Sequence, residues 1–441
     1  MHPQQLATLD RERFQRYREY LDFYHGDQWL TPASRTWQRE RRLTFNYARI
    51  FIDKLTAYLL GDMTCTVQPL EDTLEGRERA RRAEAVLSQV YEANDLQQLD
   101  YTTETDTAIL GDGCYKVTWD PDAGQVRVTA PDVQGLYAWW AADDPARVWR
   151  VATRYPLSAE EAALLSGLPA PTGGRTPPPA VTVTEVWTAQ EFQLWMDDAL
   201  VEQKPNPYRA IPFVIFPNLA APKQFWGVSD LPPVMEPARE LNRALSQLAG
   251  ILELAGNPIA VLENVEQAED IAVQPGAIWE LPEQARAYLL DLLQGGGVRL
   301  HVDYIDLLYR ALHDLSEAPR TTFGDNARSL SGVALEMELH PLLQKVRRKR
   351  LIRAAAYRRR NDLILRLLEQ HTGERYGPYR LGVVWSPVLP QDRSRLVADE
   401  RALVAAGIHS RRRAAGLLGV EEPEAEFAQW LQEQGQVHGL G

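Results

Sequence analysis

The chain has 441 residues, of which 45% are hydrophobic and 24% charged, and its formal net charge is -12. This length and hydrophobic content allow a large core and predict two to three globular domains. The acidic balance argues against a protein that clamps duplex DNA through a broad basic surface, because such binding depends on many cation–phosphate contacts. Any contact with nucleic acid is therefore expected to be local or transient.

The two cysteines, Cys65 and Cys114, lie far apart and without a CxxC spacing. This argues against a disulfide framework or a zinc site and is compatible with a reducing cytoplasm. No secretory signal is expected, since residues 1–14 carry charges where an apolar segment would stand. The best candidate for a membrane span, residues 248–262, is interrupted by a glutamate and an Asn-Pro pair, so no span is predicted.

The first half of the chain predicts helices followed by antiparallel strands, which is an α+β pattern. Helices are expected over residues 8–24, 46–60, 74–93 and 96–110, the second of them capped by Thr44 or Asn46. A hairpin is expected where CYKVTWD and VRVTA flank the turn DAGQ. Further strands are expected over residues 64–69, 148–155, 181–188, 193–197 and 212–217. The Pro/Gly-rich residues 169–180 predict an exposed loop to which we assign no role.

Residues 228–256 are the stretch around which the chain is organised. Three prolines fall in its first turns, where a missing N–H costs least, so it predicts a helix of ~27 residues and roughly 40 Å. Apolar and small residues at helical spacing are expected to pack this helix closely against others: Leu241, Leu245, Leu248, Ala249, Gly250 and Leu252. Taken alone, the pattern also fits an ordinary core helix.

A second helix is expected over residues 298–318, after a small module at 257–297. Within the module, strands are expected at 258–264 and 276–282 and a short helix at 284–293. About 40 residues with few apolar side chains are close to the lower limit for an independent fold, so the module is expected to need neighbouring copies. Two helices that carry such a module predict an element of an oligomeric ring.

Residues 320–330 predict a polar, turn-rich loop, and a long helix is expected from Gly332 to about Gln370. Between Lys345 and Arg360 this helix is exceptionally basic, although it keeps an apolar stripe. Its arginines either pair with acidic groups elsewhere or bind nucleic-acid phosphates. A strand over 379–385 and a small helical cluster complete the chain.

No specific catalytic arrangement is present. The sequence lacks GxxxxGK[ST], HExxH, GxSxG and a Gly-rich strand-to-helix turn for a dinucleotide. His301, Asp303 and Asp306 lie on a charged helix with no further ligand nearby, so they predict a solvated face rather than a metal or acid/base site. We therefore expect no catalytic residue, no metal and no cofactor, and a protein that is not an enzyme.

Six features occur in an order typical of one family and together cover nearly the whole chain. They are YHGDQW (24–29), NYARIFIDKLTAYLLGD (46–62), the helix–module–helix arrangement (228–319), FGDNARSLSGVAL (323–335), SPVLPQD after Trp385, and GIHSRRRAAGLLGVEEPEAE (407–426). In this ordered set the chain resembles the portal proteins of tailed bacteriophages, in particular siphophage-type head-to-tail connectors.

The resemblance implies a predominantly helical α+β portal fold that forms a ring of twelve subunits at one capsid vertex of the virion, around a channel for double-stranded DNA entry and exit. The implied parts are the wing (1–227, and 332–390 with the basic helix and return strand), the stem helices (228–256 and 298–318), the clip (257–297), the tunnel loop (319–331) and the crown (391–441). The implied partners are terminase, head-completion or adaptor proteins, and the major capsid and scaffolding proteins. Assembly in the host cytoplasm and no membrane partner are expected, and ATP hydrolysis would belong to terminase.

The tunnel loop is expected to approach the DNA, with Arg328 as its one obvious phosphate partner. The residues expected there are Thr321, Thr322, Phe323, Asp325, Asn326 and Arg328. On the basic helix, subunit or phosphate contacts are expected from Arg347, Arg348, Arg350 and Arg358. Subunit contacts are favoured, because unpaired arginine clusters in a ring would repel their own copies.

Two alternatives stay open. One is a different ring-shaped structural adaptor of a phage or mobile element, built on the same helical stalk. The other is a DNA-processing enzyme, which would need clustered carboxylates that the sequence does not show.

Overall fold

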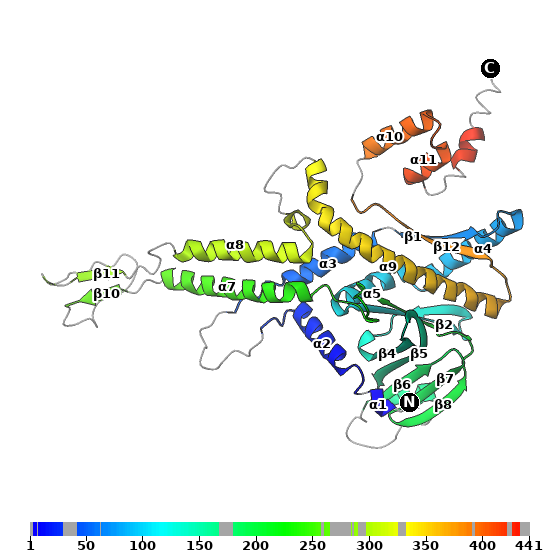
Figure 1. Cartoon of the computed structure of the whole chain (residues 1–441), viewed down its shortest axis with the longest axis horizontal. Helices are drawn as coiled ribbons and strands as arrows, with labels where there is room; N and C mark the ends of the chain where they lie inside the picture. The colour runs from blue at the N-terminus through cyan, green and yellow to red at the C-terminus, as the bar shows by residue number, and fades with distance from the viewer. Residues whose placement is uncertain are drawn as a thin grey trace. The chain divides into compact units, whose positions relative to one another are not determined.

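The structure is a computed structural model that mixes helices and strands, as an α+β chain should (Figure 1). It describes residues 3–6, 8–29, 42–61, 63–166, 180–256, 260–264, 284, 286–289, 297–324, 332–389, 393–420 and 426–432. The chain divides into two compact units, residues 1–384 and 385–441.

Helices dominate the beginning of the first unit. They are α1 (Pro3–Leu6), α2 (Arg11–His25), α3 (Tyr47–Leu60), α4 (Leu74–Ala93) and α5 (Leu96–Leu110). The side chain of Asn46 accepts a hydrogen bond from the backbone N of Arg49 at 3.1 Å, which confirms the predicted cap of α3. The apolar face of α3 is buried through Phe51, Ile52 and Leu55, so this helix is part of the core.

Among the described residues of the first unit, the strands form three sheets apart from the stalk module. Their bounds are β1 (Met63–Pro69), β2 (Asp112–Asp120), β3 (Gln125–Thr129), β4 (Leu136–Ala141), β5 (Asp144–Leu157), β6 (Val181–Trp187), β7 (Glu191–Met196), β8 (Ala199–Pro205), β9 (Phe213–Pro217) and β12 (Tyr379–Trp385). The sheet orders are β3-β2-β9, β4-β5-β6-β7-β8 and β1-β12. Two short helices, η2 (Val133–Gly135) and α6 (Ala159–Ser166), interrupt the strands.

The predicted β2–β3 hairpin is confirmed, with Lys116 opposite Thr129. The edge strand β8 was not predicted, because its sequence ALVEQKP is rich in polar residues, which are tolerated where one strand edge faces solvent. Of the Pro/Gly-rich loop at 169–180, only Ala180 lies within the described residues.

The two predicted stalk helices are present as α7 (Pro232–Gly256) and α8 (Gly297–Ser316), which pack side by side (Figure 1). Between them, β10 (Ala260–Glu263) pairs antiparallel with β11 (Arg286–Leu289). The short helix predicted over residues 284–293 is therefore wrong at β11, because pairing with β10 overrides the local preference of a segment that also contains tyrosine and leucine. The strand predicted at 276–282 lies outside the described residues.

The predicted basic helix is α9 (Gly332–Thr372), a single helix of 41 residues that continues through Pro341. It packs against α3, α4, β2 and β9, and so joins helices and strands from distant parts of the sequence. Its apolar stripe is buried through Leu342, Val346 and Leu365. The core of the first unit therefore lies along α9.

The second unit contains α10 (Arg393–Ala405) and α11 (Arg411–Leu417). Ser410 caps α11, as predicted, by accepting a hydrogen bond from the backbone N of Arg413 at 3.1 Å. Between the helices, Nδ1 of His409 lies 2.8 Å from a carboxylate oxygen of Glu400. This polar contact closes the turn between α10 and α11.

Candidate assembly site on the stalk hairpin

The base of the α7–α8 hairpin begins in a segment that is held tightly against the end of α5. A Cβ atom on Gly227 would lie 2.3 Å from the carbonyl oxygen of Gly111, so only glycine fits at this crossing. The backbone N of Asp230 donates to the carbonyl of Ala108 at 3.0 Å, and the hydroxyl of Ser229 also bonds to this helix end. The path of the chain into α7 is therefore fixed by short-range contacts.

Asp230, two residues before α7, is buried and paired with two lysines of α9. Nζ of Lys345 lies 2.9 Å from one carboxylate oxygen, and Nζ of Lys349 donates to the other, which also accepts from Nδ2 of Asn218 at 2.9 Å. Burial alone would raise the pKa of Asp230, but Lys349 and Lys345 outweigh it and hold the pKa well below its ordinary value. Asp230 is therefore a carboxylate that α9 keeps ionised inside the protein.

Lys345 also reaches the other helix of the hairpin. Its Nζ donates to the carbonyl of Ser316, the last residue of α8, at 3.2 Å, and lies 4.8 Å from the ring centroid of Phe51 on α3. One ammonium group thus contacts the start of α7 and the end of α8. We call Asp230, Ser316, Lys345 and Lys349 the base clamp.

Two arginines extend this ionic contact along α9 toward α5. Arg353 binds Glu104 through two hydrogen bonds, of 2.6 and 2.7 Å, and also donates to the carbonyl of Asn218 at 2.8 Å. Arg360 binds Asp100 in the same two-point manner. All four side chains are buried, so removing one partner would leave an uncompensated charge, which typically costs about 3–5 kcal/mol.

The buried cations were not singled out from the sequence, although a signal was available. Lys345, Lys349 and Arg353 are spaced four residues apart, which places them on one face of α9 together with the apolar stripe. Their partners Asp100 and Glu104 are also four residues apart on α5. Matching periods of opposite charge on two helices predict a helix–helix ion-pair ladder.

The arginines that were singled out on α9 have different environments and do not form one site. Arg348 pairs with Glu317 at 2.6 Å, and Nε of Arg350 donates to the carbonyl of Leu59 at 3.0 Å. Arg358 is exposed and donates to the carbonyl of Ala354 in its own helix, while Arg347 is exposed. Arg348 and Arg350 are therefore engaged within the chain, and a contact with a neighbouring subunit stays a prediction.

The small and apolar residues predicted to pack α7 divide along its length. Leu241, near the base, is buried, whereas Leu245, Leu248 and Ala249 are partly exposed and Leu252 is 52% exposed. Apart from its two chain neighbours and the nearby backbone of its own helix, a Cβ atom on Gly250 would have no heavy atom of the described chain within 4 Å. The distal half of α7 is therefore loosely covered within one chain.

One face of α8, which we call its outer face, carries exposed apolar side chains, although the hydroxyl of Tyr304 on this face donates to Glu240 of α7 at 2.9 Å. Leu300, Tyr304, Leu307 and Leu315 follow helical spacing and are 72%, 39%, 61% and 50% exposed. Leu312, on the face toward the interior, is buried. We call the four exposed residues the α8 stripe.

After the hairpin, the chain forms the short helix η3 (Arg320–Phe323). Thr322 is buried, the ring of Phe323 lies 4.9 Å from the ring of His313, and Arg320 pairs with Asp306 at 2.8 Å. Thr321 is partly exposed. The start of the predicted tunnel loop therefore packs against α8. Asp325, Asn326 and Arg328 lie outside the described residues, and the approach of the loop to DNA stays a prediction.

Neither a metal site nor a membrane span is found in the part of the chain that the structure describes. No group of three or more His, Cys, Asp or Glu side chains in these residues is placed to hold a metal ion. Among the same residues, no helix is both long and apolar enough to cross a membrane.

The fold and the hairpin define a helix-rich α+β structural protein with an apolar surface that one chain leaves open. The family model described as "Phage portal protein, SPP1 Gp6-like" matches residues 5–439. The chain therefore belongs to the phage portal protein family, a family of structural proteins, and the resemblance found in the sequence is confirmed. No curated protein matches the chain.

Proposed function

We propose that the chain forms a ring of about twelve identical copies at one vertex of the phage capsid. The ring would surround the channel through which double-stranded DNA enters during packaging and leaves during ejection. The observation that carries this proposal is the α8 stripe, an apolar surface on a hairpin whose base is already closed by the base clamp. Folding of one chain buries the residues of the base clamp, and assembly would bury the α8 stripe.

A neighbouring copy is the occupant that fits the α8 stripe. Full burial of a leucine side chain contributes about 1.5–3 kcal/mol, so a stripe of this size favours association. The distal half of α7, around Gly250 and Leu252, is the other incompletely covered surface of the hairpin. Contact between the α8 stripe of one copy and α7 of the next is head-to-tail, and such a contact closes into a ring when its rotation permits.

The charge distribution supports passage of DNA rather than tight binding. The chain has a net charge of -12. Four cations of α9 form ion pairs with carboxylates inside the chain: Lys345, Lys349, Arg353 and Arg360. Each phosphate that a protein neutralises adds affinity through counterion release, so a channel with few free cations allows DNA to slide. The tunnel loop would contact DNA locally, with Arg328 as the phosphate partner.

The parts of the ring follow the division into wing, stem, clip, tunnel loop and crown. The module around β10 and β11 would be the clip that meets terminase during packaging and head-completion proteins afterwards. Major capsid and scaffolding proteins would contact the outer parts of the ring in the virion and during assembly.

Negative-stain electron microscopy of the purified full chain tests the proposal. We expect ring-shaped top views with rotational symmetry near twelve and a central channel. Particles without a ring at any protein concentration would contradict the proposed function. In a packaging reaction with terminase and empty capsids, replacement of Arg328 by Ala should change the amount of DNA packaged, whereas unchanged packaging would remove the loop assignment alone.

A further inference from the structure

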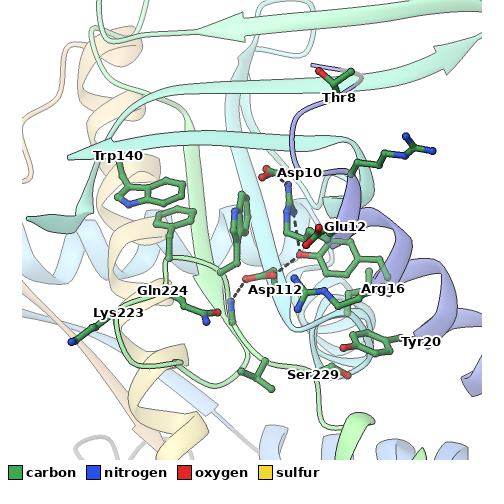
Figure 2. A pocket seen from close by; sticks show the side chains of 18 residues that line it. Thr8, Asp10, Glu12, Arg16, Tyr20, Asp112, Trp140, Lys223, Gln224 and Ser229 are labelled. Carbon is green, nitrogen blue, oxygen red and sulfur yellow. Dashed lines mark hydrogen bonds and ion pairs between the residues drawn. The ribbon is translucent and has the colours of Figure 1, made fainter. Parts of the chain in front are cut away.

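A cleft of about 740 Å³ lies outside the stalk hairpin, between α2, the end of β4 and the loop that leads to α7 (Figure 2). Its lining combines aromatic rings with charged side chains from segments that are far apart in the sequence. Neither the proposed channel nor the α8 stripe uses this cleft. It is large enough to hold a turn of another polypeptide, since ligand pockets typically measure roughly 300–1,000 Å³.

The interior of the cleft is built from groups that contact one another within the chain. The rings of Trp140 and Phe225 stack with centroids 4.1 Å apart, and the guanidinium of Arg13 lies 3.6 Å from the ring centroid of Trp226. Asp112 is buried and accepts hydrogen bonds from the hydroxyl of Tyr17 and from the backbone N of Gly227, as the dashed lines in Figure 2 show. The cleft is therefore held in shape before anything binds.

The rim of the cleft differs from its interior. Arg11 and Arg16 on α2 and Lys223 on the facing loop are exposed, and none of the three has a carboxylate within 4 Å in the described part of the chain. Arg16 and Lys223 lie on opposite sides of Asp112 in Figure 2. Glu12 is the one exposed acidic residue of the lining. The rim is therefore positive on a chain whose net charge is strongly negative.

We propose that this cleft binds a carboxylate-bearing turn of a neighbouring copy of the chain. The inference rests on the proposed ring, because the occupant is a second copy. A guanidinium such as that of Arg16 can hold a carboxylate through two hydrogen bonds, and the stacked rings offer an apolar surface to the residues beside it. The chain presents exposed carboxylates in the turns at Asp143–Asp144 and Asp197–Asp198, where Asp144 and Asp197 each also accept one backbone hydrogen bond within the chain.

Nucleic acid is the less suitable occupant. A duplex is too wide to enter the cleft, and its phosphates would meet Glu12 at the rim and Asp112 in the interior, both of which repel a polyanion. A single carboxylate carries one negative charge, so these groups repel it less than they repel a polyanion. In a ring of acidic copies, a positive cleft also offsets part of the mutual repulsion.

Zero-length carbodiimide cross-linking tests the contact directly, because this reagent joins a lysine to a carboxylate only when the two touch. Copies labelled with ¹⁴N and ¹⁵N are mixed before assembly, cross-linked as rings and analysed by mass spectrometry. We expect Lys223 to be joined to an Asp or Glu of the oppositely labelled copy. Lys204, whose Nζ lies 2.9 Å from Glu202, is the internal control and should cross-link only within one copy. Cross-links of Lys223 confined to its own copy, or none, would overturn the proposal.

Charge reversal gives an independent readout. The double variant Arg16→Glu with Lys223→Glu should require at least tenfold more protein to form rings, with an unchanged melting temperature. The matched control, Arg18→Glu with Lys54→Glu, makes the same charge change at exposed sites outside the cleft and should assemble like the wild type.

The outcomes separate this proposal from the proposed function. Wild-type rings that the cleft variant also forms at the same concentration would refute the cleft contact and leave the ring intact. A wild-type chain that never forms rings would refute the proposed function itself. Loss of binding to a short DNA duplex with normal ring assembly would identify the rim as a phosphate site and overturn the proposal.

Discussion

The base of the stalk hairpin and its outer face differ in chemistry: the base consists of buried ion pairs, and the outer face of exposed apolar side chains. At the base, Asp230 and the cations of α9 are buried and paired within one chain. On the outer face, Leu300 and Leu307 are largely exposed although both are apolar. The difference indicates that folding of one chain completes the base, whereas the outer face needs a second chain. Changes at the base should therefore affect stability, and changes on the outer face should affect assembly.

The largest effect on stability is expected from Asp230→Ala. The substitution leaves Lys345 and Lys349 buried without their shared carboxylate, and breaking a buried ion pair in this way typically costs about 3–5 kcal/mol. Chemical denaturation of the unassembled chain measures the loss. A loss below about 1 kcal/mol would mean that the base clamp does not stabilise the hairpin.

The base clamp should also make the protein sensitive to acid. Because the pKa of Asp230 is lowered in the folded chain, its contribution to stability is fully present above the unfolded value of about 4 and is lost as the pH falls through the folded value. Unfolding measured from pH 5 to pH 2 should show a shallower loss in Asp230→Ala than in the wild type. Equal slopes would contradict the coupling.

Asp112 should contribute with the opposite sign. Burial raises its pKa to about 6, although hydrogen bonds from Gly227 and Tyr17 oppose the shift. The folded chain then holds this proton more firmly than the unfolded chain, so ionisation of Asp112 lowers stability as the pH rises from about 4 to 6. Asp230 and Asp112 therefore act in opposite directions on the pH dependence of stability, and Asp230→Ala removes the contribution of Asp230.

On the outer face, Leu300→Ser with Leu307→Ser should leave the unassembled chain stable, because both side chains are exposed there. Each buried leucine contributes about 1.5–3 kcal/mol to an interface, so ring formation should require at least tenfold more protein. Mass photometry over a concentration series measures assembly, and thermal melting provides the control. Normal assembly of the double variant would show that the α8 stripe is not part of the interface between copies.

A smaller effect on assembly is expected from Gly250→Leu. Within one chain the new side chain meets open space, and replacing a helical glycine gains up to about 1 kcal/mol of helix stability. A neighbouring stem packed closely at Gly250 would clash with the leucine and raise the concentration needed for rings. Unchanged assembly would show that α7 near Gly250 faces solvent in the ring and does not contact a neighbouring copy.

The smallest effect is expected from Glu317→Gln. Its partner Arg348 is exposed, and surface ion pairs contribute about 1 kcal/mol or less. The comparison with Asp230→Ala is direct, since both carboxylates pair with cations of α9. Equal losses of stability from the two substitutions would contradict the distinction between the base and the surface.

The elements with strong local signals were predicted from the sequence. The cap of α3 at Asn46, the β2–β3 hairpin and both stalk helices depend on spacing and turn residues that lie close together in the chain. The strand β11 was predicted as a helix because its structure depends on pairing with β10. Local pattern reading cannot resolve such a segment.

The buried ion pairs of α9 depend on residues that are distant in sequence. Arg353 and Glu104 are 249 positions apart, and Lys349 and Asp230 are 119 apart. The four-residue spacing of the cations on α9 was visible in the sequence, but whether that face of α9 meets α5 was not. The positions of the partners on α5 and before α7 decide this.

Native mass spectrometry of the wild-type chain beside Leu300→Ser with Leu307→Ser tests the central claim most directly. The account predicts a ring of about twelve copies for the wild type and mainly monomers, with an unchanged melting temperature, for the variant. A wild type that remains a monomer or dimer at every concentration, or a variant that forms the same rings, would contradict it.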